Sequence, residues 1–79
     1  MINICDLLYS ICEDKRVYDK DFDLIESGLL DSFMFIELFS KLEDNGIEII
    51  PTRIDRDRLR TPGSIELLVK EYIDNNHLS

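Results

Sequence analysis

The sequence lacks a long apolar run, a cluster of metal-binding side chains and an excess of basic residues. Cys5 and Cys12 are its only cysteines and His77 is its only histidine. On one helix the two cysteines would lie about 10 Å apart along the axis, which is too far for a disulfide. A structural zinc site is equally unexpected with so few ligands. These absences exclude the disulfide-stabilised and zinc-dependent classes of small domain.

The chain also has no apolar run that approaches the length of a membrane span. Its N-terminus shows no basic region followed by a continuous apolar segment, so no signal peptide is predicted. We therefore expect a complete, cytoplasmic chain that does not insert directly into a membrane.

Positive charge is scarce, because 17 acidic residues face nine basic ones and the net charge is −8. Residues 1–48 hold 12 acids and four bases, whereas residues 49–79 hold five of each. Such a field repels nucleic acid and favours basic partners, and its self-repulsion favours a monomer. The basic cluster Arg53–Arg60 is interleaved with acids, so we expect it to pair with the acidic half of the chain or with a partner protein.

What the chain does have is helical periodicity over the length of one domain, residues 1–79. The pattern predicts an all-α fold, a small four-helix bundle with three main helices, one short helix, a long first loop and no strand. The first helix should begin after a cap at Asn3, and its core stripe is Ile4, Leu7, Leu8 and Ile11. Residues 14–31 should then form an acidic loop whose apolar side chains pack across the bundle.

The second helix is expected over residues 32–45, with its end at Asn45-Gly46. Its buried face should consist of four large residues at helical spacing, namely Phe35, Leu38, Phe39 and Leu42. An extended stretch should follow, with Ile47, Ile49 and Ile50 packed on the core before Pro51. A short helix anchored by Ile54 and Leu59 should lie within residues 53–60. The last helix should open at Thr61-Pro62 and fray at Asn75 and Asn76.

The sequence gives little support for metal binding or for catalysis. Asp19, Asp21 and Asp23 imitate the first, third and fifth ligands of an EF-hand, but Leu24 and Leu30 stand where the loop needs glycine and glutamate. We therefore predict no metal site. Catalysis by the chain itself is not expected either, because a nucleophilic serine needs a neighbouring base and the only histidine lies in the C-terminal tail.

The most informative segment is Gly28-Leu29-Leu30-Asp31-Ser32-Phe33, which leads directly into the second helix. It presents the Ser32 hydroxyl at the positive end of a helix dipole, where an attached anion would meet free backbone N–H groups. Ser32 is thus better interpreted as the substrate of another enzyme than as a nucleophile. The alternative is that the chain is an unmodified helical protein-interaction module.

At this segment the sequence resembles the acyl carrier protein family. The resemblance extends along most of the chain and rests on these stretches: Leu24–Phe33, Ile36–Leu38, Leu42–Glu43, Gly46–Ile49 and Pro51. The stretch Arg56–Pro62 is most similar to D-alanyl carrier proteins and stand-alone peptidyl carrier proteins.

The resemblance implies that Ser32 is esterified with 4′-phosphopantetheine by a phosphopantetheinyl transferase and that Asp31 helps to present the serine. The chain would then hold an acyl or aminoacyl group as a thioester. It would carry this group from an adenylating ligase to a downstream acyl-accepting enzyme.

One further prediction concerns the surface beside Ser32. On a helical wheel Phe33, Ile36, Glu37 and Ser40 share an arc that turns away from the core. We predict that Phe33 and Ile36 are apolar anchors for the ligase and the transferase, with Glu37 at the rim. The alternative is that both side chains pack under the first loop or under residues 53–60.

Overall fold

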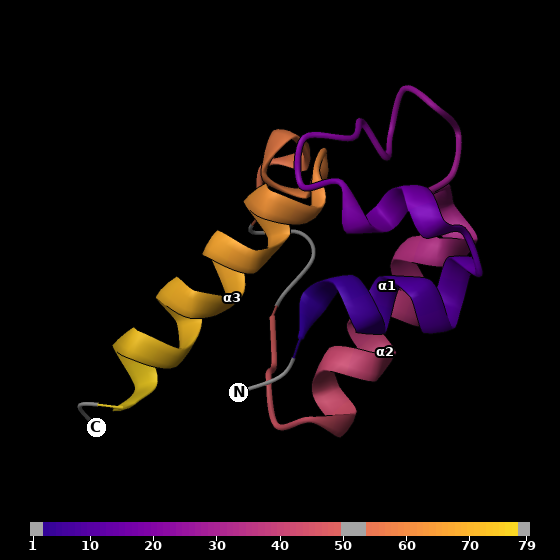
Figure 1. Ribbon diagram of the computed structural model, residues 1–79. Helices are drawn as coiled ribbons and strands as arrows, with labels where there is room; N and C mark the ends of the chain where they lie inside the picture. Colours follow the sequence, from indigo (N-terminus) through magenta and orange to yellow (C-terminus); the bar gives the residue numbers. More distant parts are fainter. Residues whose placement is uncertain (1–2, 50–53, 78–79) are drawn as a thin grey trace.

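The structure, a computed structural model, describes residues 3–49 and 54–77. It contains three α-helices, α1 (Ile4–Cys12), α2 (Ser32–Asp44) and α3 (Pro62–His77), and two 3-10 helices, η1 (Lys15–Tyr18) and η3 (Arg56–Leu59) (Figure 1). No strand occurs in these two ranges. The all-α prediction is therefore confirmed, including the three main helices, the short helix before the last one and the long first loop.

Helix α1 begins and ends as its sequence dictates. The side chain of Asn3 accepts a hydrogen bond from the N–H of Asp6 at 3.2 Å, which confirms the predicted cap. Ile4, Leu7 and Leu8 are buried. The helix stops at Glu13, whose left-handed backbone (φ 53°) turns the chain toward the first loop.

The first loop is packed on the core, as predicted. Val17, Leu24 and Leu30 are fully or almost fully buried. The loop also contains η1, which the sequence did not reveal: Asp14 caps this turn by accepting a hydrogen bond from the N–H of Arg16 at 2.9 Å. A turn of this kind needs one cap and one buried residue rather than a periodic stripe.

Helix α2 differs from its predicted burial. Leu38 and Leu42 are buried, but Phe35 and Phe39 are only partly so. The reason lies in the arrangement of the helices, because α2 packs against α1 whereas α3 packs against α1 and η3 (Figure 1). The side of α2 that bears the two phenylalanines therefore faces a groove.

The end of α2 follows the prediction. Gly46 takes a left-handed backbone (φ 80°), and the N–H of Ile47 reaches back to the carbonyl of Leu42 at 2.9 Å. Residues 47–49 are irregular, with Ile47 buried. The predicted contributions of Ile50, Pro51 and Arg53 lie outside the described residues.

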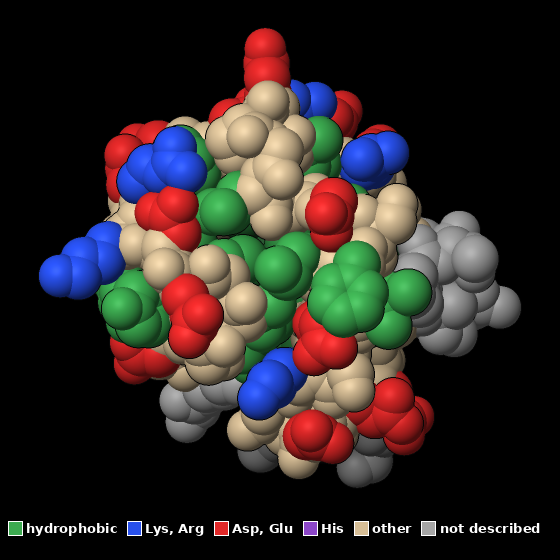
Figure 2. Space-filling model, turned by 90° about the vertical axis from the view of Figure 1, so that its right-hand side faces the viewer, with side chains coloured by type: hydrophobic (Ala, Val, Ile, Leu, Met, Phe, Trp, Pro, Cys, Tyr) green, Lys and Arg blue, Asp and Glu red, His purple; other side chains and the backbone are tan. Residues whose placement is uncertain are grey.

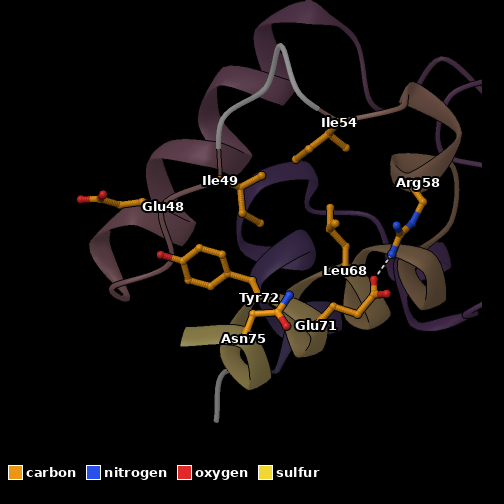
Figure 3. A pocket seen from close by; sticks show the side chains of 8 residues that line it. All are labelled: Glu48, Ile49, Ile54, Arg58, Leu68, Glu71, Tyr72 and Asn75. Atoms are coloured by element: carbon orange, nitrogen blue, oxygen red, sulfur yellow. Dashed lines mark hydrogen bonds and ion pairs between the residues drawn. The ribbon is translucent and has the colours of Figure 1, made fainter. Parts of the chain in front are cut away.

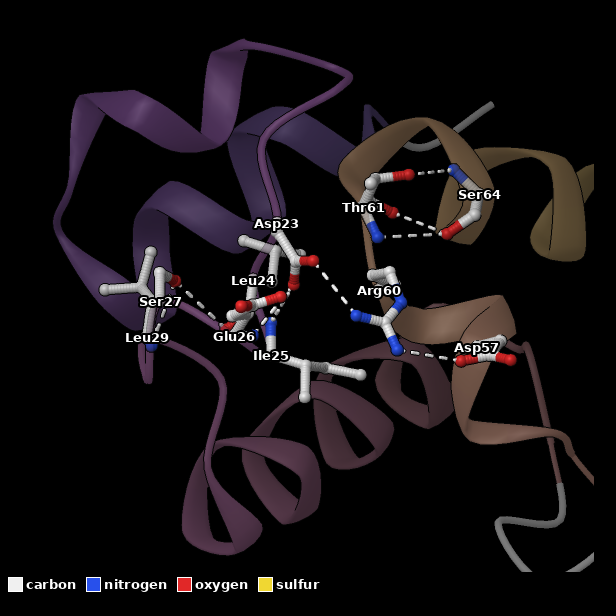
Figure 4. Close-up of polar contacts among 10 residues, drawn as sticks. All are labelled: Asp23, Leu24, Ile25, Glu26, Ser27, Leu29, Asp57, Arg60, Thr61 and Ser64. Atoms are coloured by element: carbon white, nitrogen blue, oxygen red, sulfur yellow. Dashed lines mark hydrogen bonds and ion pairs between the residues drawn. The ribbon is translucent and has the colours of Figure 1, made fainter.

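Helix α3 opens at a reciprocal cap. The Thr61 hydroxyl oxygen accepts from the N–H of Ser64, and the Ser64 hydroxyl oxygen accepts from the N–H of Thr61, both at 3.1 Å (Figure 4). The predicted start at Thr61-Pro62 is thus confirmed. The helix continues through Asn75 and Asn76 to His77, so the asparagines do not end it where fraying was expected.

The described residues form one core with contributions from every helix and from the first loop. Its buried members are Ile4, Leu7, Leu8, Val17, Leu24, Leu30, Leu38, Leu42, Ile47, Leu59, Ile65 and Val69. The molecule is elongated, 37 × 24 × 21 Å, because α3 extends beyond the other helices (Figure 1). None of the helices found in the described ranges has the length and apolar character needed to cross a bilayer.

Candidate functional site

The approach to Ser32 is a short turn fixed at both ends. Gly28 adopts a left-handed backbone (φ 79°), a conformation that a residue with a side chain rarely takes. The N–H of Leu30 then bonds the carbonyl of Leu24 at 2.9 Å, and the Leu30 side chain is buried. The next two residues, Asp31 and Ser32, consequently emerge on the surface at a defined point.

Asp31, not Ser32, is the cap of α2. Its side-chain oxygen accepts a hydrogen bond from the N–H of Met34 at 3.0 Å, and its carbonyl accepts from the N–H of Phe35 at 2.9 Å. Ser32 is the first residue of the helix and does not cap it. Asp31 instead fixes the first turn and so determines where the next residue points.

Ser32 is exposed, and its hydroxyl makes no hydrogen bond to any residue that the structure describes. Within the same ranges the backbone N–H groups of Ser32 and Phe33 also have no acceptor, as expected in the first turn of a helix. An anion joined to the Ser32 oxygen would meet these donors and the positive end of the α2 dipole.

A groove runs beside Ser32, between α2 and η3. It has a volume of about 420 Å³ and is lined by Ser32, Phe35, Ile36, Phe39, Ile54, Arg56 and Leu59. A second hollow of about 600 Å³ shares its three large α2 side chains and reaches Ile47 and Ile49. The surface next to the serine is therefore a largely apolar groove, to which the partly exposed side chains of Phe35 and Phe39 contribute.

Arg56 supplies a positive charge in this groove. Its guanidinium carbon lies over the ring of Phe35, 5.6 Å from the ring centre. Sequence reasoning missed this residue, because the four arginines of the 53–60 cluster look alike when only their charges are compared. A helical-wheel comparison could not have paired Phe35 with Arg56, since their contact depends on how η3 lies relative to α2.

Two of the three residues predicted as partner contacts are exposed. The exposed fraction is 64% for Phe33 and 68% for Ile36, whereas Glu37 is half-buried. The alternative that the two apolar side chains pack under the first loop or under η3 is therefore wrong. On the face drawn in Figure 2, exposed hydrophobic side chains are bordered by acidic groups. The role of Phe33, Ile36 and Glu37 in partner binding stays a prediction.

A hollow of about 400 Å³ beside α3 is a weaker candidate. It is lined by Glu48, Ile49, Ile54, Arg58, Leu68, Glu71, Tyr72 and Asn75 (Figure 3). Arg58 and Glu71 are joined there as an ion pair, which neutralises two of the three charged side chains in the lining. Ser32 does not line this hollow, which adjoins the groove beside Ser32 because Ile54 lines both.

The cysteines are poor nucleophiles in this environment. Burial is the first cause that raises the pKa of the Cys12 thiol, and the carboxylates of Asp14 and Asp31 raise it further. Burial likewise raises the pKa of Cys5, followed by the charge of Glu66. Both thiols are therefore less ionised near neutral pH than an ordinary cysteine, which makes them less reactive as nucleophiles.

The acidic loop has a structural role in the described part of the chain. Asp23 accepts hydrogen bonds from the N–H groups of Ile25 and Glu26, and its second oxygen bonds Arg60 (Figure 4). No group of three or more His, Cys, Asp or Glu side chains placed to hold a metal ion is found among the described residues. The predicted pairing of the arginine cluster with the acidic half of the chain is confirmed for Arg60, which contacts Asp23, whereas Arg58 pairs with Glu71 of α3.

Comparison with known proteins identifies the relatives of this chain. No protein-family model matches it. The D-alanyl carrier protein of Bacillus velezensis is 38% identical over 64 residues, which cover 78% of this chain and 82% of the relative. The D-alanyl carrier protein of Bacillus subtilis has the same identity and coverage. That of Abiotrophia defectiva is 33% identical over 72 residues, covering 89% of this chain and 91% of the relative.

These relatives match the resemblance that the segment around Ser32 indicated, and they extend it along most of the sequence. The helical architecture agrees with a carrier protein of the acyl carrier type. At 33 to 38% identity over 78 to 89% of its length, the chain belongs to the family of the D-alanyl carrier proteins.

Proposed function

We propose that this chain is a D-alanyl carrier that bears 4′-phosphopantetheine on Ser32. The observation that carries the proposal is the exposed Ser32 hydroxyl, free of hydrogen bonds to the described residues, directly after the cap of α2. The D-alanyl cargo is supported by the names of the relatives, each of which is a D-alanyl carrier protein.

The residues around Ser32 fit this prosthetic group. In the attachment step the Ser32 oxygen forms a bond to the phosphorus of coenzyme A that carries the pantetheine, the bond to the nucleotide breaks, and the serine proton passes to the transferase. Asp31 holds the first turn of α2, and the N–H groups of Ser32 and Phe33, which have no acceptor among the described residues, suit a phosphodiester. When bound, the group supplies a thiol that can carry an acyl group as a thioester.

The proposal includes three partners: a phosphopantetheinyl transferase, an adenylating ligase and a downstream acyl-accepting enzyme. A carrier must be released by each enzyme in turn, and charge complementarity favours fast association over tight binding. Exposed Phe33 and Ile36 offer a small apolar contact beside the serine. The chain would act in the cytoplasm as a monomer, without a catalytic group of its own.

A single carrier domain over residues 1–79 is part of the same proposal. It is supported by the one hydrophobic core that joins α1, the first loop, α2 and α3. The alternative, an unmodified interaction module, accounts for the exposed apolar side chains but leaves the similarity to carrier proteins unexplained.

Intact-mass spectrometry tests the attachment site. The purified chain is incubated with a phosphopantetheinyl transferase, coenzyme A and magnesium, beside the variants Ser32→Ala and Ser40→Ala. Ser40 is an exposed serine on the same helix and serves as the matched control. Wild type and Ser40→Ala should gain one prosthetic group, and Ser32→Ala should gain none. A gain in Ser32→Ala, or no gain in wild type, contradicts the proposal.

The cargo is tested on the loaded protein. With a D-alanine-activating ligase and ATP, the modified wild type should acquire D-alanine in a hydroxylamine-sensitive bond, and L-alanine should be incorporated more slowly. Ser32→Ala should remain unacylated. Failure of the modified wild type to accept D-alanine from this ligase would contradict the D-alanyl assignment while leaving the carrier role intact.

A further inference from the structure

Arg56 differs from the other described arginines in its ionic contacts. Arg16, Arg58 and Arg60 each form an ion pair with a carboxylate of the chain. Within the described ranges Arg56 has no such partner. The chain has 17 acids and nine bases, so carboxylates are plentiful. Arg56 nevertheless lies beside the proposed attachment serine and leaves its charge available to a ligand.

The position of Arg56 is fixed by two features. Asp55 caps the short helix η3 by accepting a hydrogen bond from the N–H of Asp57 at 3.0 Å, which sets the direction in which Arg56 leaves the backbone. Its guanidinium then lies over the Phe35 ring, an arrangement in which the cation is attracted to the ring face. The planar donor group is thereby held at the groove without losing its charge.

Arg56 and Ser32 line the same groove, so one ligand can reach both. A serine-linked phosphodiester carries one negative charge, and arginine binds phosphate oxygens with its planar array of N–H donors. The remaining walls are apolar, with Phe35, Ile54 and Leu59 among them, and suit the alkyl part of an extended arm. Without Arg56, the excess of acidic groups in residues 1–48 would repel the phosphodiester.

We propose that Arg56 is a positioning residue that binds the phosphodiester of the arm on Ser32 and so seats the arm in the groove between α2 and η3. The inference rests on the proposed function, because it requires the phosphopantetheine to be attached. The seated arm would keep its thiol end near one face of the carrier until a partner enzyme draws it out.

Nuclear magnetic resonance on the isolated, modified chain tests whether the arm lies in this groove. Isotope-labelled protein is loaded with an unlabelled arm, and intact mass is checked first. Filtered spectra then record proximity between arm methyl protons and protein side chains, and the phosphorus spectrum records the phosphodiester. The variants are Arg56→Gln and Arg56→Lys, with Arg58→Gln as the control: it removes the same charge from η3 at a residue that lines the other hollow.

Wild type and Arg58→Gln should show contacts from the arm to Phe35 and Phe39, which line the groove and not the other hollow. Arg56→Gln should lose them and shift the phosphorus resonance, and Arg56→Lys should retain them in part. Absence of arm contacts in the loaded wild type, or their full retention in Arg56→Gln, overturns the inference about Arg56. Neither result contradicts the proposed function. Failure of wild type to accept the arm overturns the proposed function and the inference together. An unchanged melting temperature in each variant confirms that the comparison concerns folded protein.

Discussion

The carboxylate of Asp23 and the guanidinium of Arg60 are joined by a hydrogen bond of 3.0 Å between Oδ2 and Nη1 that spans 37 residues of sequence (Figure 4). The backbone reinforces this contact, since the N–H of Leu24 bonds the carbonyl of Arg60 at 2.7 Å. The loop that leads to Ser32 is thus tied to the end of η3, the short helix that presents Arg56. The two sides of the groove are held together at this point.

The Asp23–Arg60 contact predicts a pH dependence of stability. The pKa of Asp23 is lowered from its ordinary value of 3.8, first by the backbone N–H of Glu26 and then by Arg60. Because folding lowers this pKa, the carboxylate stabilises the fold above its ordinary pKa, and the contribution is lost as the pH falls through the lowered value. Asp23→Asn should therefore melt at a lower temperature than wild type at neutral pH, and the gap should close in acid.

The matched control for this prediction is Asp21→Asn. Asp21 is a neighbouring exposed acid whose carboxylate has no hydrogen-bond or ion-pair partner among the described residues. Thermal melts of the three proteins between neutral pH and about pH 3 provide the measurement. If Asp21→Asn lowers the melting temperature as much as Asp23→Asn does, the effect is one of net charge and the specific contact is irrelevant.

The division of roles at the start of α2 predicts a contrast between adjacent residues. Asp31→Ala removes the cap of the helix and should destabilise the fold by about 1 kcal/mol. Ser32→Ala removes an exposed hydroxyl without a described partner, so its free energy of unfolding should stay within about 0.5 kcal/mol of wild type. Chemical denaturation of both variants measures the difference. A larger loss of unfolding free energy for Ser32→Ala than for Asp31→Ala would show that Ser32, and not Asp31, caps the helix.

Local features of the fold could be predicted from the sequence because they depend on neighbouring residues. The cap at Asn3 and the turn at Gly46 are examples, and both follow from the side chain or backbone of one or two residues. The apolar spacing placed the three main helices for the same reason. The site segment was found because an acid and a serine directly precede a helical pattern.

Other features could not be predicted, because they depend on distant parts of the chain. Periodicity places Phe35 and Phe39 on one face with Leu38, but it does not say how completely that face is covered. Charge alternation in residues 53–60 likewise does not say which arginine meets Asp23 and which meets Phe35. Those contacts depend on how η3 lies relative to α2 and to the first loop, and the groove beside Ser32 lies between α2 and η3.

The excess of acidic groups predicts a dependence of stability on ionic strength. Residues 1–48 hold 12 of the 17 acids, and repulsion among them is reduced when ions screen the charges. The melting temperature should therefore rise as sodium chloride increases from about 0.02 to 0.5 M, where the screening length becomes short. Neutral osmolyte at matched osmolality is the control. A melting temperature that is flat or falls with salt contradicts the prediction.

The exposure of Ile36 predicts that its side chain serves partner binding and contributes little to stability. Ile36 is 68% exposed, whereas Leu38, two residues further along α2, is fully buried. Leu38→Ala should destabilise the fold by about 2–5 kcal/mol, because it leaves a cavity in the core. Ile36→Ala should change stability by no more than about 0.5 kcal/mol. Thermal and chemical denaturation of the two variants measures this contrast.

Loading by the ligase should show the opposite order, with Ile36→Ala impaired more than Leu38→Ala. If Ile36 is an apolar anchor, its truncation removes about 2 kcal/mol of binding to the ligase, which lowers the loading efficiency roughly 30-fold. Leu38→Ala, assayed below its melting temperature, should load nearly as well as wild type. Loading is measured as thioester formed per unit time at limiting carrier concentration. Normal loading by Ile36→Ala would remove Ile36 from the interface, even though the residue is exposed.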